Sequence, residues 1–235
     1  KRVSSMDFIT EGFFQAFQLL FSGNEETYSA IFATVKVSSL CIALSLLIGI
    51  PLGFLLGYFE FSGKRQLRAI SDTLLALPTV VVGLFVYAFI TYRGPLGDLE
   101  LLYTITGIAI AQTVLVVPIV ISLTATAIES LDRRLKPTLI ALGAQGRQIA
   151  FTSLVEARFA VLIAAITAYG RAISEVGISM IIGGNIKWHT RTITTAITLE
   201  TGKGEFSMGI ALGIVLLAFA FIVNYSLAFL RKRSA

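Results

Sequence analysis

The amino-acid sequence predicts an all-α protein, a polytopic transmembrane helical bundle. The chain of 235 residues is 55% hydrophobic and only 14% charged, whereas soluble domains hold about a quarter charged residues. Five of its apolar segments are long enough for the roughly 18–20 residues that a spanning helix needs. The net charge of +5 is concentrated in a few loops, which is typical of topology signals rather than of a nucleic-acid-binding surface.

Residues 1–28 are expected to form an amphipathic helix followed by a polar turn. From Asp7 to Ser22, polar side chains recur every three or four positions, and phenylalanine and leucine fill the other faces. About four helical turns are shorter than a standard span. We therefore expect this helix to lie in the membrane interface, and a crossing of the membrane is the alternative.

The five long spans follow in order and make up one membrane domain, residues 29–230. Proline interrupts the first three spans at Pro51, Pro78 and Pro118, and we expect a kink at each. Backbone groups freed in lipid need partners in neighbouring helices or in a water-filled cavity, so broken helices favour a bundle interior that carries polar cargo. Ordinary proline tolerance is the alternative for Pro51 and Pro118. The spans are expected near residues 29–58, 69–92, 103–127, 160–184 and 207–230.

Charge predicts the topology. Eleven of the 19 basic residues lie in three segments, which hold three, five and three of them: after the first span, after the third and after the fifth. Five spans place these segments on one side, and positive-inside bias makes that side the cytoplasm. The loop at 129–158 and the basic tail at 231–235 are therefore expected to be cytoplasmic, in a multi-pass protein of the cytoplasmic membrane.

Two ionisable residues of the fourth span are candidates for function, because charge is expensive in hydrocarbon. Arg171 and Glu175, on either side of Ser174, are four positions apart, so we expect them to share a helix face and to pair. A purely structural pair and a gate or pathway-lining charge are both compatible with this spacing.

The segment after this span is rich in hydrogen-bond donors. Gly183 and Gly184 are expected to end or unwind the helix and to expose amide groups that can form a concave anion site. Asn185, Lys187 and Arg191 add donors, and the segment itself holds no acidic residue. Such a segment favours an oxyanion over a cation or a sugar. A helix C-cap followed by an exposed turn is the alternative.

Catalytic motifs are missing from the sequence. It has no phosphate-binding loop, no HExxH, no CxxC and no GxSxG motif. Cys41 lies in an apolar span, and His189 has no nucleophile or ligand cluster beside it in sequence. We therefore expect no enzyme, no catalytic residue and no metal or cofactor site in this chain. If ATP drives the protein, another chain binds the ATP.

The cytoplasmic loop resembles the coupling motif of type I ABC importer permeases. That motif has a Glu-Ala-Ala triplet, a glycine four residues later and a closing Ile-x-Leu-Pro. Leu142-Gly143-Ala144 matches the glycine region, whereas residues 137–139 and 153–156 differ from the triplet and from the closing element.

The wider match is to the tungstate-specific ABC permeases, which are relatives of the molybdate and sulfate permeases. It extends from about residue 25 to the C-terminus, so residues 29–230 correspond to an ABC transmembrane type-1 domain. The runs that carry the resemblance are Leu77–Leu84, Val155–Arg158, Gly170–Gly177, Gly183–Ile186 and Thr194–Thr201.

The resemblance implies an importer of tungstate that works by alternating access. Its expected parts are a homodimer of this subunit in the lipid bilayer, two cytoplasmic ABC ATPase subunits that bind ATP and magnesium, and an extracytoplasmic tungstate-binding protein. Molybdate, or sulfate or thiosulfate, is the alternative cargo. An ion-coupled secondary transporter is the alternative from another class, although Glu175 is the only clear acid within a span.

The resemblance also implies roles for particular residues. One stretch is expected to form a coupling helix in a cleft of the ATPase, with Gly143 permitting close approach of backbones and Arg147 facing an acidic partner group. The residues of this helix are Ala141, Leu142, Gly143, Ala144, Gln145, Gly146, Arg147, Gln148 and Ile149. The candidates for the pathway or its gate are Pro78, Thr79, Val80, Arg171, Ser174, Glu175, Gly183, Gly184 and Asn185.

Overall fold

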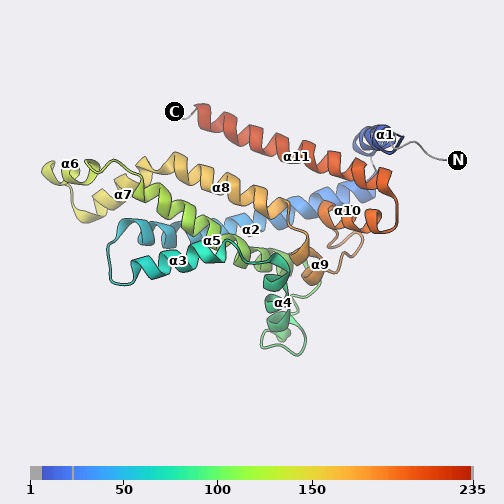
Figure 1. The fold of residues 1–235 in the computed structure, drawn as a ribbon, viewed down its shortest axis with the longest axis horizontal. Coiled ribbons are helices and arrows are strands. Elements are labelled where there is room, and N and C mark those ends of the chain that lie inside the picture. Colours follow the sequence, from blue (N-terminus) through green and yellow to red (C-terminus); the bar gives the residue numbers. More distant parts are fainter. Residues whose placement is uncertain (1–6, 23, 234–235) are drawn as a thin grey trace.

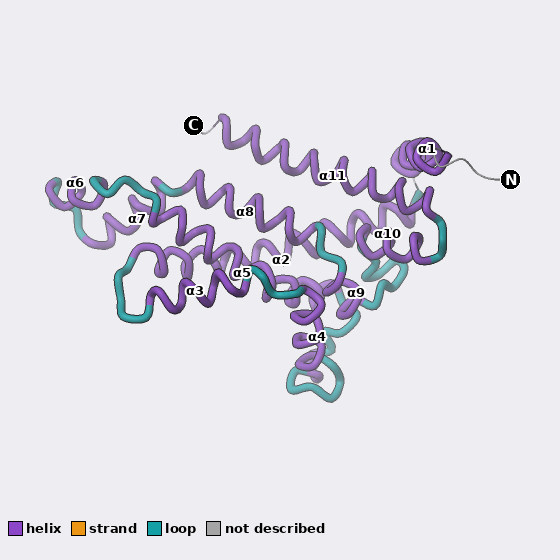
Figure 2. The backbone as a smooth tube through the Cα atoms, in the orientation of Figure 1, coloured by secondary structure: helices purple, strands orange, loops and turns teal. Residues whose placement is uncertain are grey.

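The computed structural model describes residues 7–22 and 24–233. These residues fold into helices joined by short loops, and they include no β-strand (Figures 1 and 2). The predicted all-α class is therefore confirmed. In chain order the helices are α1 (Asp7–Phe21), α2 (Glu25–Tyr58), α3 (Lys64–Leu74), α4 (Thr79–Ile90), the 3-10 helix η1 (Gly97–Leu99), α5 (Ile105–Glu129), α6 (Leu135–Ala141), α7 (Gly146–Glu156), α8 (Arg158–Ile173), α9 (Gly177–Gly183), α10 (Ile193–Gly202) and α11 (Phe206–Arg233).

Side-chain caps mark where α2 and α5 begin. The Asn24 side-chain oxygen accepts the Thr27 N–H at 2.9 Å, and the Thr104 hydroxyl accepts the Gly107 N–H at 2.9 Å. Amide groups in the first turn of a helix have no partner within the helix, so these caps stabilise both starts.

α2 and α5 pack along each other at the centre of the bundle. Gly49, Gly53 and Gly57 recur at every fourth position and therefore share one face of α2. A Cβ atom at Gly53 would lie 2.7 Å from the Ile121 carbonyl oxygen, and one at Gly57 would lie 2.7 Å from the Ala125 carbonyl oxygen. Small residues at this spacing let membrane helices approach closely. The glycine face, Gly49–Gly53–Gly57, is thus what lets the two backbones meet.

The three prolines affect their helices differently. α2 continues through Pro51 and α5 through Pro118 as single helices, so ordinary proline tolerance describes these two positions. Pro78 separates α3 from α4, whose axes differ by 99°. A residue before proline is pushed away from helical geometry, and the Leu77 N–H closes a tight turn with the Leu74 carbonyl at 3.3 Å. The predicted interruption occurs at Pro78 alone.

Two single helices, α2 and α5, are long and apolar enough to cross a membrane. The bent pairs α3–α4 and α7–α8 raise the number to four if each pair is one span. The spans expected at 69–92 and 160–184 are both broken, the first at Pro78, where the sequence predicts a kink, and the second after Ile173, where α8 ends. In α11, a shorter apolar stretch covers Phe206–Ile222. The described helices therefore form a membrane bundle but do not reproduce five uninterrupted spans.

The elongated bundle has two different ends (Figure 1). α6 and α7 form one end, whereas α1, α10 and the start of α11 lie at the other. α4 projects sideways, with the 91–104 loop at its tip. The amphipathic helix expected at 7–22 is present as α1 and packs across α11, where the Ser207 hydroxyl donates to the Glu11 carboxylate at 3.2 Å.

Polar contacts hold α3, which has no buried residue, against α5. Arg68 Nη1 donates to the Ser122 carbonyl at 3.0 Å, and the Ser122 hydroxyl donates to Asp72 Oδ1 at 2.7 Å. Lys64 Nζ lies 3.6 Å from Glu129 Oε1. Basic residues that the sequence marks as topology signals therefore also fasten the bent α3–α4 pair to the core.

Gly53→Ala should destabilise the protein, because the added methyl group would lie 2.7 Å from the Ile121 carbonyl oxygen and push α2 away from α5. Overpacking of this kind costs about 1–3 kcal/mol. The melting temperature in detergent, measured by fluorescence-detected size-exclusion chromatography, should fall by several degrees. Gly213→Ala in α11 is the matched control, since a Cβ there meets no atom within 4 Å. Equal melting temperatures for the two variants would contradict the close packing.

Candidate functional site

The segment Ala141–Ile149, expected to be one coupling helix, is a corner between two helices. α6 ends, a turn follows, and α7 begins within it. Gly143 has a φ of +79°, its N–H donates to the Ile140 carbonyl at 2.9 Å, and the Ala144 N–H donates to the Leu139 carbonyl at 3.0 Å. This pair of bonds is the Schellman motif, in which a glycine ends a helix. The left-handed conformation at Gly143 therefore replaces the continuous helix.

A capping box closes the other side of the corner. The Gln145 N–H donates to the Gln148 side-chain oxygen at 2.7 Å, and the Gln145 side chain accepts in return from the Gln148 backbone. This reciprocal arrangement stabilises the first turn of α7. Ile149 is buried and anchors the corner to the bundle.

The rest of the corner projects from the end of the molecule (Figure 1). Leu142 is 77% exposed, and Ile140 of α6 and Phe151 of α7 are exposed at the same end of the bundle. A Cβ at Gly146 would meet no atom within 4 Å, and Arg147 points into solvent. Exposed apolar side chains gathered in one place are typical of a surface that binds a partner.

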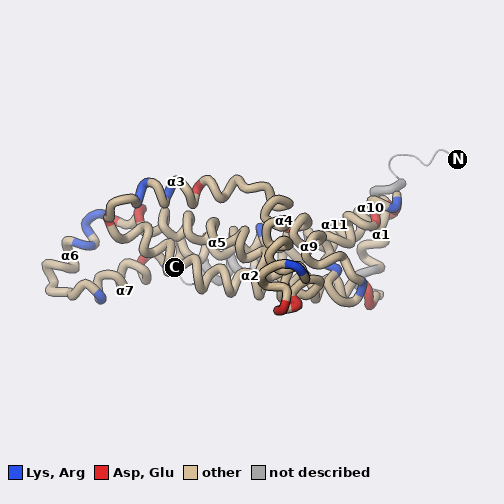
Figure 3. Tube along the Cα trace, turned by 90° about the horizontal axis from the view of Figure 1, so that it is seen from below, with Lys and Arg blue, Asp and Glu red and all other residues tan. Residues whose placement is uncertain are grey.

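Basic residues gather at the same end of the bundle (Figure 3). Those at 64–68 open α3, those at 133–136 surround the start of α6, and Arg147 lies on α7. Loops far apart in sequence thus bring positive charge to one end. A shared end is what the positive-inside expectation requires of these loops.

Arg171 and Glu175 form the predicted ion pair, with Arg171 Nη1 3.0 Å from Glu175 Oε2. They do not share a helix, because α8 ends at Ile173 and Glu175 lies in the link to α9. The Glu175 side chain is 2% exposed and that of Arg171 is 37% exposed. The second carboxylate oxygen, Oε1, accepts the Ile178 N–H at 3.1 Å. Both oxygens of this buried carboxylate are therefore partnered, as burial of a charge demands.

The backbone carbonyl of Glu175 also joins two helices, α9 and α10, through hydrogen bonds. Its carbonyl accepts hydrogen bonds from the Ser179 hydroxyl at 3.3 Å and from the Thr194 hydroxyl at 3.0 Å. Gln112 of α5 donates to the Ser179 hydroxyl at 3.1 Å, while its own carbonyl oxygen has no partner in the described part of the chain. With hydroxyl groups of α2, these residues surround a space that is too small to hold a water molecule. We call this cluster the Glu175 junction.

Gln112 was missed by the sequence reasoning, although a signal for it exists. It is an amide in the middle of an apolar span, and polar groups in that position are expensive unless they have a partner or a function. In the structure, Ser179 of α9 is the partner of Gln112.

The predicted gate candidates fall into two groups. The Pro78–Val80 stretch, at the start of α4, lies beside the Glu175 junction: a Cβ at Gly177 would lie 3.1 Å from Thr79 Oγ1 and 3.4 Å from Glu175 Oε1. Ser174 belongs to the same group, and its hydroxyl donates to a carbonyl in the last turn of α8 at 3.1 Å. The second group lies at the other end of α9.

Gly183, Gly184 and Asn185 form this second group and end α9. Gly184 has a φ of +66°, and its N–H donates back to the helix at 3.0 Å. The Ile186 N–H donates to the Thr190 hydroxyl at 3.1 Å. Because these two amides are already occupied, the helix C-cap describes this segment better than the open anion site that the paired glycines suggest.

The cations after this cap are paired with an acid that the sequence reasoning missed. Glu26, in the first turn of α2, accepts a hydrogen bond from Lys187 Nζ at 2.8 Å on one oxygen and from Arg191 Nη1 on the other. The segment after α9 holds no acidic residue of its own, but the fold places the Glu26 carboxylate of α2, 165 positions away from Arg191, beside its cations.

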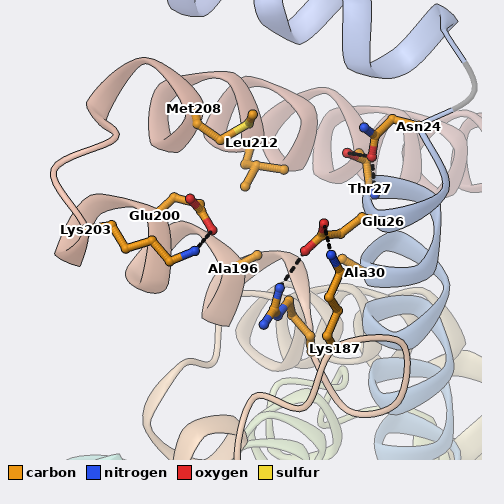
Figure 4. Close-up of a pocket in the computed structure, with 11 residues that line it drawn as sticks. Asn24, Glu26, Thr27, Ala30, Lys187, Ala196, Glu200, Lys203, Met208 and Leu212 are labelled. Atoms are coloured by element: carbon orange, nitrogen blue, oxygen red, sulfur yellow. Dashed lines mark hydrogen bonds and ion pairs between the residues drawn. The ribbon is translucent and has the colours of Figure 1, made fainter.

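A pocket of about 400 Å³ lies beside this cluster (Figure 4). Its walls come from the start of α2, the 184–192 loop, α10 and the start of α11. Figure 4 shows Lys187 and Glu26 on one wall and the Glu200–Lys203 pair, 2.8 Å apart, on another. The described residues contain no group of three or more metal-ligating side chains.

The chain is similar to known transport proteins over nearly its whole length. It is 49% identical to the tungstate uptake system permease protein TupB of Campylobacter jejuni over 220 residues, which cover 94% of this chain and 92% of that protein. It is 41% identical to TupB of Peptoclostridium acidaminophilum over 219 residues, which cover 93% and 96%.

A solved structure shares the fold. A bacterial ABC transporter involved in the import of the acidic polysaccharide alginate matches 97% of this chain and 88% of its own chain, with a TM-score of 0.75 and 18% sequence identity. The two relatives and the family match below confirm the resemblance to importer permeases that the sequence predicts. Residues 49–235 match the binding-protein-dependent transport system inner membrane components, and the chain belongs to this family.

Proposed function

We propose that this chain is the membrane-spanning permease subunit of an ATP-driven importer of tungstate, with molybdate as the nearest alternative cargo. The observation that carries this proposal is the 49% identity, over nearly the whole chain, to a tungstate uptake permease. Two copies form a homodimer in the cytoplasmic membrane. Two separate ABC ATPase subunits bind ATP and magnesium, and an extracytoplasmic binding protein delivers the anion.

The proposed topology has five spans. They are α2, the bent pair α3–α4, α5, the bent pair α7–α8 and α11, with α9 and α10 on the outer side. The corner between α6 and α7 and the C-terminus then face the cytoplasm. The basic residues that gather at the same end of the bundle as the corner support this orientation (Figure 3).

The corner is the proposed contact with the ATPase subunits. Leu142, Ile140 and Phe151 offer an exposed apolar surface, and Gly143 leaves its outer side open, since no atom lies within 4 Å of its Cβ position. Arg147 is exposed and available to an acidic group of the ATPase. Closure of the ATPase subunits on ATP would draw the two corners of the homodimer together.

α8 is the proposed link between the corner and the pathway. It follows α7 with a bend of 55° and ends at the Glu175 junction, next to Pro78–Val80. A displacement of the corner is thus passed along one helix to a break where α4, α9 and α10 meet. Two states that differ in contacts at both ends of α8 would couple ATP binding to alternating access.

Competition for uptake tests the cargo. In vesicles that hold the assembled complex and its binding protein, uptake of labelled tungstate should be inhibited more strongly by molybdate than by sulfate at equal concentration. The reason is size, because molybdate and tungstate are nearly equal tetrahedral dianions and sulfate is smaller. Equal competition by sulfate would overturn the tungstate assignment.

Leu142→Asp tests the ATPase contact. Leu142 is 77% exposed, so the substitution should leave the melting temperature of the isolated permease unchanged. It should nevertheless reduce co-purification of the ATPase subunits and the uptake that depends on them, because an uncompensated charge would enter an apolar contact.

The matched control for this variant is Tyr92→Asp, because Tyr92 is 92% exposed and lies in the loop at the tip of α4. It should retain the ATPase subunits. If Leu142→Asp also retains them and transports normally, the corner is not the contact.

Charge removal at the Glu175 junction tests its role. Arg171→Gln should reduce assembly more than Glu175→Gln, because it leaves a buried carboxylate with one partner fewer, at a cost of up to about 3–5 kcal/mol, whereas Arg171 is partly exposed. The double variant should regain the assembly lost in Arg171→Gln. Complex yield and ATP-dependent uptake are the two measurements. Regained assembly together with regained uptake would mean that the pair is structural and not a gate.

A further inference from the structure

The pocket of Figure 4 is separate from both the corner and the Glu175 junction. It lies between α2, α10 and α11, at the end of the bundle opposite to α6 and α7. Its volume of about 400 Å³ far exceeds the share of one water molecule, about 30 Å³. The charged residues that line it are Lys187, Arg191, Lys203, Glu26 and Glu200, three cations against two carboxylates.

Arg191 has hydrogen-bond donors to spare. A guanidinium carries five N–H groups, of which Nη1 binds Glu26 and Nη2 reaches the Asn185 carbonyl at a long 3.5 Å. Nε is buried and has no partner among the described residues. A buried donor without a partner is costly, so the hydrogen-bonding capacity of Arg191 is not fully used by its partners among the described residues.

Glu26 occupies the position that a free anion would take between the two cations. One of its oxygens accepts from Lys187 and the other from Arg191. The side chains of Glu26 and Lys187 are 40% and 47% exposed, whereas that of Arg191 is 14% exposed. Arg191 is therefore the fixed member of the cluster, and Glu26 can turn into water without burying a bare charge.

We propose that Lys187 and Arg191 form an oxyanion subsite in the outer part of the permease and that Glu26 is its exchangeable occupant. A tetrahedral dianion takes the place of the Glu26 carboxylate, with two of its oxygens against the same two cations. This inference rests on the proposed function, because it names where the imported oxyanion first meets the permease.

Exchange with Glu26 explains how such a site can bind and release. A dianion gains more than a carboxylate from two adjacent cations, so it can displace the side chain. The tethered carboxylate remains close at hand and competes for the same donors. This competition limits the affinity of the subsite for the oxyanion, so the oxyanion can leave the subsite and enter the pathway.

Equilibrium binding of tungstate to the purified complex of permease and ATPase subunits, without the binding protein, tests the subsite. The measurement is titration calorimetry in lipid nanodiscs. Glu26→Gln should tighten binding by about ten-fold, because it removes the competing charge and keeps the side-chain shape, and Lys187→Gln should weaken it by about ten-fold. Arg191→Gln should abolish binding. Since Lys187 is half exposed, its variant keeps the test valid if Arg191→Gln does not fold.

Arg93→Gln is the matched control, because Arg93 is an exposed cation in the 91–104 loop, outside the pocket. Its dissociation constant should equal that of the unaltered complex. Equal weakening by Arg93→Gln and Lys187→Gln would overturn the subsite, and so would unchanged or absent binding in Glu26→Gln.

Uptake by the same complex with its binding protein and ATP separates this inference from the proposed function. Tungstate uptake by the unaltered complex, combined with any of these contrary binding results, refutes the subsite alone. Failure of the unaltered, assembled complex to take up tungstate refutes the proposed function.

Discussion

The close approach of α2 and α5 over the glycine face is the constraint on which the rest of the bundle depends. With the two backbones this near, neither helix can slide or rotate without a clash against a carbonyl oxygen. The register is then set for everything else these helices carry, including Glu26 at the start of α2 and Gln112 in the middle of α5. The broken helices are arranged around this fixed pair.

A helix that breaks within a membrane leaves backbone groups that must find partners in the protein. At the break between α8 and α9, side chains supply these partners: the Glu175 carboxylate accepts the Ile178 N–H, and the Ser179 and Thr194 hydroxyl groups donate to the Glu175 carbonyl. Side-chain partners can be exchanged more readily than the internal bonds of a helix. The break is therefore the part of the bundle best suited to adopt two arrangements.

The sequence predicts what depends on local pattern. Apolar length identifies α2 and α5, the spacing of Arg171 and Glu175 predicts their pairing, and proline chemistry predicts the break at Pro78. Tertiary packing decides the rest. Whether Pro51 interrupts a helix depends on its neighbours, and the contacts of Glu26 depend on a fold that brings distant segments together. The turn at Gly143 could in part be predicted from the sequence, because a glycine that follows an apolar helical run is a local signal for a C-cap.

The Arg171–Glu175 pair and the cluster of Glu26 with Lys187 and Arg191 differ in the burial of the carboxylate, which decides whether they can exchange partners. The carboxylate of Glu175 is buried, so separating it from Arg171 would leave a charge that neither water nor protein satisfies. The carboxylate of Glu26 is partly exposed, so water replaces whatever it loses. In the proposed importer, an incoming oxyanion can compete with Glu26 but not with Glu175. Cargo is therefore received at the outer cluster, whereas the Glu175 junction changes only when the helices around it move.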